Sequence, residues 1–197
     1  MKKIKSDPDT FVNKRPTRRC REKWSFGKAF ARDIVICGVI VGIVSCFVRP
    51  TIVNQTSMLP TCEPGDYLLV EKQAYRTSNP DRFDIIIFKS SLASDNGRGT
   101  KVLIKRVIGL PGEHVVIKDG KVYIDEIRLS EERIKKDMYT GGNVDCIVPD
   151  NSFFVMGDNR EDSIDSRYSE VGCVNKEAIT GKAWFRLFPT DSFGKIE

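Results

Sequence analysis

The stretch HVVIKDGKVYID, His114–Asp125, consists of two runs of β-branched and aromatic residues that meet at an Asp-Gly pair. Asp-Gly between two such runs is typical of the tight turn of a β-hairpin. Similar strand-like runs lie on both sides of it: Asp66–Lys72, Phe83–Lys89, Val102–Gly109 and Ser152–Asp158. Turn signals separate these runs, and Leu129–Lys136 is the one helix candidate after residue 50. The sequence therefore predicts an all-β domain of strongly bent antiparallel sheets over residues 50–197.

One apolar run, IVICGVIVGIVSCFV (Ile34–Val48), precedes this domain. It is shorter than the ~20 residues that cross ~30 Å of hydrocarbon. Phe26–Asp33 extends it, since long basic side chains there can reach back to the lipid headgroups. A buried core helix of this length would be expected to have a polar face, which the run lacks. We therefore expect one N-terminal transmembrane helix over residues 34–48, rather than a core helix.

A motif within this run, IVSC (Ile43–Cys46), is similar to the lipid-attachment box of bacterial lipoproteins. The box lies inside the apolar run and not at its end, so lipidation is not expected.

The charge of the chain is unevenly distributed. Residues 1–33 hold eleven Lys and Arg against four Asp and Glu, a net charge of +7. Because the whole chain has a net charge of +5, residues 34–197 carry −2. A basic tail can bind nucleic acid or flank a membrane anchor on the cytoplasmic side. The tail has no helix-turn-helix pattern and runs directly into the apolar segment. We expect a cytoplasmic segment 1–33, a single span in the cell membrane, and an extracytoplasmic domain 50–197, with the lipid bilayer and not nucleic acid as a partner.

The six cysteines do not form an evident framework. Cys62, Cys146 and Cys173 follow the apolar run, and because three is odd, at least one of them is unpaired within the chain. No Cys or His spacing is typical of a metal site, so no metal or cofactor is expected.

A candidate nucleophile, Ser57, lies in VNQTSMLPT (Val53–Thr61), shortly after the apolar run. A serine hydroxyl needs a base to remove its proton. The single histidine, His114, opens a hairpin strand and is typical of an exposed structural position. The rival base is a lysine, which must be neutral, although only about one in a thousand is neutral near pH 7.5 at an ordinary pKa. Burial in apolar surroundings corrects this by lowering the pKa.

Lys105 has such surroundings, in VLIKRVIG. Strand alternation equally allows this side chain to point to solvent. Lys105 and Arg106 cannot both lie on one face of a flat strand, so one of them is expected to be buried or paired.

Three segments together resemble the signature boxes of type I signal peptidases: SMLPT (Ser57–Thr61), KRVIGLPGE (Lys105–Glu113) and GDNREDSIDSR (Gly157–Arg167). RFDIIIFK and the tail GKAWFRLFP (Gly181–Pro189) are also similar to that family, and the compact form resembles its single-span Gram-positive members. The resemblance implies a bent antiparallel catalytic domain and a serine endopeptidase that removes signal peptides from exported preproteins. We expect it to act as a monomer.

The resemblance also implies the roles of individual residues. Ser57 would be the nucleophile and Lys105 the general base, with the Ser163 hydroxyl bonded to the lysine amine. Asp165 with Arg167, and Asp158 with Arg106, would form supporting pairs. An extended substrate would lie between the segment that begins at Ile52 and the one formed by Val102, Leu103 and Ile104, with Met58 in the apolar pocket.

Two positions depart from the family pattern. Gln55 stands where relatives have a small residue that in some helps to hold the oxyanion, so the Ser57 backbone N–H is the safer donor. Cys62 replaces a common leucine.

Rivals of other classes fit less well. Self-cleaving repressors share a Ser–Lys β-domain but would carry a DNA-binding region. An inactive relative that acts as an assembly chaperone would have lost the serine or the lysine. A domain that only binds peptides remains an alternative, which acylation of Ser57 would exclude.

Overall fold

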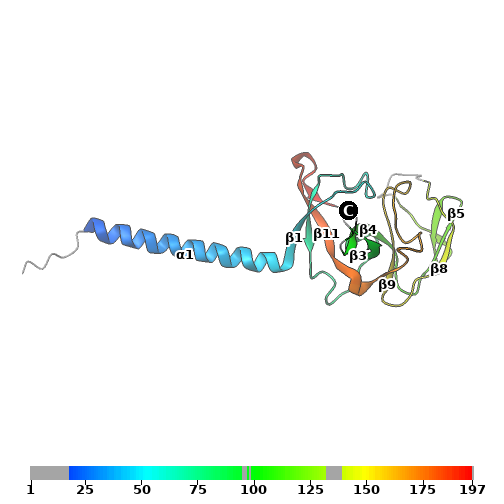
Figure 1. The fold of residues 1–197 in the computed structure, drawn as a ribbon, viewed down its shortest axis with the longest axis horizontal. Coiled ribbons are helices and arrows are strands. Elements are labelled where there is room, and N and C mark those ends of the chain that lie inside the picture. The colour runs from blue at the N-terminus through cyan, green and yellow to red at the C-terminus, as the bar shows by residue number, and fades with distance from the viewer. Residues whose placement is uncertain (1–17, 95–96, 98, 132–138, 197) are drawn as a thin grey trace, which may run out of the picture. The chain divides into compact units, whose positions relative to one another are not determined.

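The computed structural model describes residues 18–94, 97, 99–131 and 139–196, in two compact units, Met1–Val44 and Ser45–Glu197. Helix α1, Arg18–Phe47, begins well before the apolar run from which it was expected (Figure 1). Its part Lys28–Phe47 is long and apolar enough to cross a membrane, and none of it is buried against protein. The predicted N-terminal apolar helix is therefore present.

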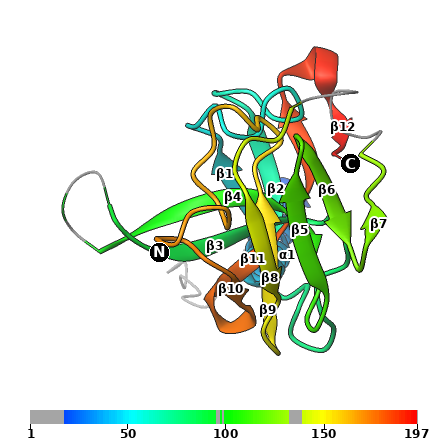
Figure 2. The same ribbon diagram turned by 90° about the vertical axis from the view of Figure 1, so that its right-hand side faces the viewer.

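The second unit is built from antiparallel strands (Figures 1 and 2). Its larger sheet has the order β1-β2-β11-β3-β4-β9-β10, with β12 paired to β11. The bounds of these strands are Val48–Ile52 (β1), Tyr67–Glu71 (β2), Ile85–Ala93 (β3), Thr100–Gly109 (β4), Ser152–Met156 (β9), Val174–Asn175 (β10), Ile179–Phe188 (β11) and Gly194–Lys195 (β12). Short 3-10 helices, Lys176–Ala178 and Thr190–Ser192, flank β11.

The smaller sheet has the order β7-β6-β5-β8. Its strands are His114–Lys118 (β5), Lys121–Ile124 (β6), Ile127–Arg128 (β7) and Val144–Ile147 (β8). The predicted hairpin joins β5 to β6, and Asp119 and Gly120 at its turn have φ of 51° and 73°. Positive φ at both central residues is the conformation for which Asp-Gly is selected.

Register shifts in β4 and β11 mark bulges, which bend and twist strands. The predicted bent, antiparallel all-β domain is confirmed. Within the helix candidate Leu129–Lys136, residues 129–131 are not helical and 132–136 lie outside the described residues.

A hydrophobic cluster lies directly under the segment that carries Ser57: Val53, Met58, Cys62, Leu68, Val70, Ile85, Ile87 and Ala183. Backbone hydrogen bonds tie that segment to the residue before β2, from Val53 N to Asp66 O (2.9 Å), and to itself, from Cys62 N to Met58 O (2.8 Å). The turn around Ser57 is therefore held by burial on one side and by its own hydrogen bonds.

Candidate active site

Ser57 and Lys105 lie together in the interior of the β-domain. Lys105 Nζ is 2.5 Å from Ser57 Oγ, within hydrogen-bonding distance. The two residues are only 1% and 6% exposed, for Lys105 and Ser57 respectively. Lys105 is carried by β4, where it pairs with Ile86 of β3. A rigid central strand thus brings a lysine amine onto the hydroxyl of a turn 48 residues away in sequence.

Burial lowers the pKa of Lys105 from 10.5 to about 8. Asp165, Asp158 and Asp162 oppose this change, while Arg167 adds to it. Because two of the three carboxylates are held by arginines, their attraction for the lysine is offset and desolvation prevails.

The first of these ion pairs joins Arg106 and Asp158. Two bonds connect them, from Nε to Oδ1 (2.8 Å) and from Nη2 to Oδ2 (2.7 Å), and both side chains are fully buried. Arg106 also donates to Phe83 O at 3.0 Å. Lys105 and Arg106, neighbours on one strand, are therefore both buried, on opposite faces of β4.

The second ion pair joins Arg167 and Asp165, again through two bonds, of 2.8 and 2.9 Å. Asp165 Oδ2 also accepts from Gly157 N at 3.0 Å, and Arg167 donates to Arg160 O at 2.9 Å. These contacts fold the segment Gly157–Arg167 back on itself. Because Asn159 N donates to Ser57 O at 3.1 Å, this segment also holds the turn that carries Ser57.

Ser163 departs from the expectation. Its Oγ is buried but has no hydrogen-bond partner in the described part of the chain, so the expected bond to the Lys105 amine is not formed. The amine is instead directed at Ser57 Oγ. The Ser163 side chain packs against Gly157, where an added Cβ would lie 2.2 Å from its Oγ.

A groove of about 320 Å³ opens at the Ser57–Lys105 pair. It is lined by Asn54, Gln55, Thr56, Ser57, Leu92, Lys101, Leu103, Lys105, Asp162 and Ile164. Lys101, Leu103 and Lys105 alternate along β4, as side chains on one face of a strand must.

Four of the expected substrate-binding side chains do not line this groove. Met58 is fully buried in the cluster beneath the turn, because it points to the opposite side from Ser57. Val102 and Ile104 belong to the other face of β4, and Ile52 is an exposed end of β1. Leu103 and Gln55 do line it.

Thr56, Lys101 and Asp162 were missed by the sequence analysis. Thr56 Oγ1 donates to Asp162 Oδ2 at 2.7 Å, which connects the residue before Ser57 to the segment Gly157–Arg167. The alternation of VLIKRVIG, extended by one residue toward the N-terminus, would have found Lys101. Nothing in the sequence around Asp162 marked it as a site residue, apart from its position within the segment Gly157–Arg167.

The rival base lies elsewhere. His114 is on β5 of the smaller sheet, where its Nε2 lies 2.7 Å from Asp145 Oδ1. It does not line the groove, so it has no contact with Ser57 there.

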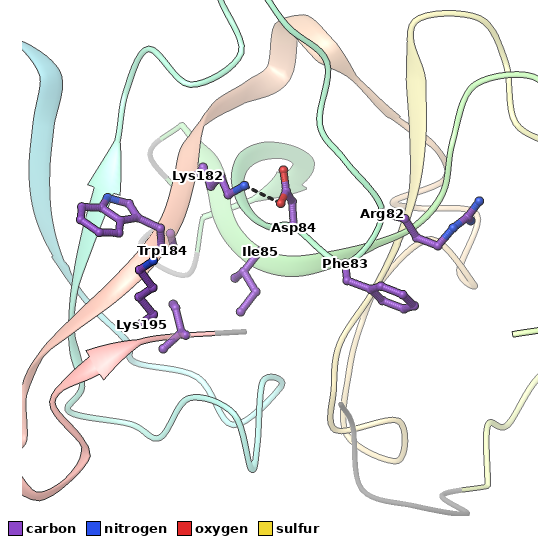
Figure 3. Close-up of a pocket in the computed structure, with 9 residues that line it drawn as sticks. Arg82, Phe83, Asp84, Ile85, Lys182, Trp184 and Lys195 are labelled. Carbon is purple, nitrogen blue, oxygen red and sulfur yellow. Dashed lines mark ion pairs between the residues drawn. The ribbon is translucent and has the colours of Figure 1, made fainter. Parts of the chain in front are cut away.

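A second pocket, of about 280 Å³, lies between β3, β11 and β12 (Figure 3). Lys182 and Asp84 form an ion pair of 2.5 Å at its wall, and Arg82 pairs with Glu113. Its charged groups are thus largely committed to one another, and it contains no nucleophile beside a base.

The family of the chain follows from comparison with known proteins. Residues 27–188 match the family model of signal peptidases, peptidase S26. The chain belongs to this signal peptidase family. Probable signal peptidase I-1 of Synechocystis sp. is 38% identical over 177 residues, covering 88% of both chains. Signal peptidase I of Bacillus licheniformis is 32% identical over 178 residues, covering 85% of this chain and 92% of the relative. These relatives identify the chain as a hydrolase of the signal peptidase I type.

A solved signal peptidase I from Enterococcus faecalis V583 is also similar, with 34% identity and a TM-score of 0.43. It aligns over 53% of this chain and 97% of the solved one.

Proposed function

We propose that this signal peptidase is membrane-anchored and cleaves the signal peptides of exported preproteins with Ser57 as nucleophile and Lys105 as general base. The observation that carries the proposal is the 2.5 Å contact between Ser57 Oγ and a buried lysine whose pKa is lowered to about 8. A neutral amine at hydrogen-bonding distance from a hydroxyl is the arrangement that activates a serine.

The reaction follows from that arrangement. The neutral Lys105 amine takes the Ser57 proton as Oγ attacks the scissile carbonyl. The protonated amine then gives the proton to the leaving nitrogen, and the mature protein departs from an acyl-enzyme. A water molecule, deprotonated by the same lysine, hydrolyses the ester. The Ser57 backbone N–H, and the Gln55 amide in the groove wall, are our candidates to stabilise the oxyanion.

The substrate would bind as an added β-strand. β9 pairs with β4 only from Arg106 onward, so over Val102–Lys105 the described pairings join β4 to β3 on one side alone. An extended peptide between this edge and the segment Ile52–Gln55 would complete the ladder. The family resemblance implies small residues at the −1 and −3 positions, and Leu103, Leu92 and Ile164 supply apolar wall beside the dyad.

Supporting residues would keep the dyad in place. Asp158 with Arg106, and Asp165 with Arg167, hold the walls of the site and keep carboxylates from pairing with Lys105. Ser163, whose hydroxyl has unused bonding capacity, would orient the amine during the cycle.

Anchoring by Lys28–Phe47 in the lipid bilayer, as a single span, would keep a monomeric domain beside emerging preproteins. Twenty residues of mean hydropathy 2.1, flanked by the basic N-terminal segment, support this part of the proposal.

The test is cleavage of a purified preprotein by the full chain in detergent, with the new N-terminus sequenced. Ser57→Ala should lower turnover by several orders of magnitude while binding of the preprotein survives. Ser78→Ala, at an exposed serine that bonds only to Ala74 O, is the matched control and should leave turnover unchanged. A wild-type chain that binds preprotein without cleaving it would instead support the inactive, peptide-binding alternative.

A further inference from the structure

Cys146 and Cys173 lie in contact, although they are 27 positions apart in the sequence. Their side chains are close enough to interact, and both are half-buried. Both pack against the same hydrophobic cluster, which includes Val115 and Phe154. The fold, rather than the local sequence, has brought these two thiols together.

The two cysteines also lie in or next to the edge strands of the two sheets, β8 and β10, which are labelled in Figure 2. Cys146 lies on β8, the last strand of the smaller sheet, and Cys173 directly precedes β10, the last strand of the larger one. A bond between them would join the edges of two sheets that share a cluster but, in the described pairings, no strand ladder.

The other described cysteines have different surroundings. Cys62 is fully buried near Arg186, while Cys37 and Cys46 are exposed on α1. Among the residues that the structure describes, Cys146 and Cys173 are thus the cysteine pair in contact.

We propose that Cys146 and Cys173 are a redox-active pair that forms a disulfide in the folded domain and cross-links its two sheets. The reaction is thiol–disulfide exchange with a small-molecule or protein disulfide as the oxidant. One cysteine thiolate attacks the oxidant disulfide and releases a thiolate. The second attacks the resulting mixed disulfide at the protein sulfur and releases the other. The two cysteine sulfurs are oxidised, the oxidant is reduced to two thiols, and these take up the two protons that the cysteines lose.

Burial sets the rate of this step. It raises the pKa of the Cys173 thiol to about 11 and raises the pKa of Cys146 as well. Since the thiolate is the attacking species, oxidation is slow at neutral pH and accelerates as the pH rises.

The cross-link would enclose the supporting segment of the active site. The covalent ring runs through residues 147–172, which include β9 and the segment Gly157–Arg167 with the carboxylates of Asp158 and Asp165. Closing a ring restricts the unfolded chain and thereby stabilises the fold. Exposure to extracellular oxidants rests on the proposed topology, whereas the capacity to form the bond does not.

The experiment uses the full chain in detergent, purified reduced and incubated with oxidised glutathione at pH 8.5. The Ser57→Ala variant is used, so that the result is independent of peptidase activity. After denaturation and alkylation, mass spectrometry should find the Cys146-containing and Cys173-containing peptides joined, with two hydrogens lost and Cys62 alkylated. The midpoint of thermal unfolding of the domain should rise by roughly 5–10 °C, and dithiothreitol should reverse the rise.

Cys146→Ser and Cys173→Ser, singly and together, should show no such rise, whereas Cys62→Ser should retain the cross-link. Two outcomes would overturn the proposal. One is full alkylation of both Cys146 and Cys173 after oxidation, and the other is a glutathione adduct on each in place of a joined peptide.

Discussion

The proposed role of Lys105 as general base depends on the groups that surround its amine. At a pKa of about 8, roughly a quarter of the amine is neutral at pH 7.5, against about 0.1% at an ordinary value. Between pH 8 and 10.5 the unfolded chain binds more protons at this residue than the folded chain does. Lys105 therefore destabilises the fold by about 3 kcal/mol below pH 8, and this effect disappears as the pH rises to 10.5.

The pH dependence of turnover should report this lysine. With a short signal-sequence peptide, activity should fall about tenfold per pH unit below pH 8, because protonated Lys105 cannot accept the Ser57 proton. Lys105→Arg should lose at least 10²-fold, since guanidinium stays charged throughout this range.

His114→Asn is the matched control for the pH profile and should leave the acid limb in place, because His114 lies on the smaller sheet beside Asp145. An acid limb near pH 4, a limb that moves in His114→Asn, or full activity of Lys105→Arg would each contradict the assignment.

The sequence predicted the identity of the two central residues of the site better than it predicted the direction of the side chains around them. The apolar neighbours of Lys105 and the resemblance of three boxes were sufficient to select Ser57 and Lys105, which the structure brings into contact. Side-chain direction was harder. Met58 and Val102 were expected at the substrate, but the turn and the strand direct them elsewhere, and neither direction is encoded in a residue's immediate neighbours.

At the scale of elements, the backbone of the segment Gly157–Arg167 packs closely against the turn that carries Ser57. Gly157 is packed so closely that an added Cβ would lie 2.5 Å from Ser57 O and 2.2 Å from Ser163 Oγ. Ser163 can rotate away, but the Ser57 carbonyl belongs to the turn that presents the nucleophile.

Gly157→Ala should therefore displace that turn. Since misplacement of about 1 Å at a catalytic group can cost 10²-fold, we expect a loss of turnover of that order with a folded domain by circular dichroism. Gly141→Ala is the matched control, because nothing lies within 4 Å of its added Cβ and the substitution should be silent. Equal turnover of the two variants would show that the close approach at Gly157 is not needed.

Prediction of elements succeeded where alternation or a turn signal was strong and failed where it was not. The hairpin at Asp119-Gly120 and the central strands followed from such patterns. β11 was missed because Gly181, Lys182 and Arg186 interrupt its apolar residues, and its pairing with both β2 and β3 overrides that weak local preference. β8 and β10 are short edge strands, for which few residues carry any pattern.

At the scale of the whole molecule, the distribution of charge predicts orientation in the membrane. Residues 1–33 carry +7, from eleven basic and four acidic residues, immediately before the apolar part of α1. Basic residues resist translocation, so this flank should stay in the cytoplasm and the β-domain should lie outside.

Protease added to intact protoplasts of an expressing bacterium should digest the domain and leave a short N-terminal fragment, while a cytoplasmic marker protein stays intact. A variant with Gln in place of the Lys and Arg of residues 14–28 should lose this uniform orientation, giving a mixture of digested and protected domain. A wild-type domain that is degraded only after the protoplasts are lysed would place it in the cytoplasm and contradict the proposed role on exported preproteins.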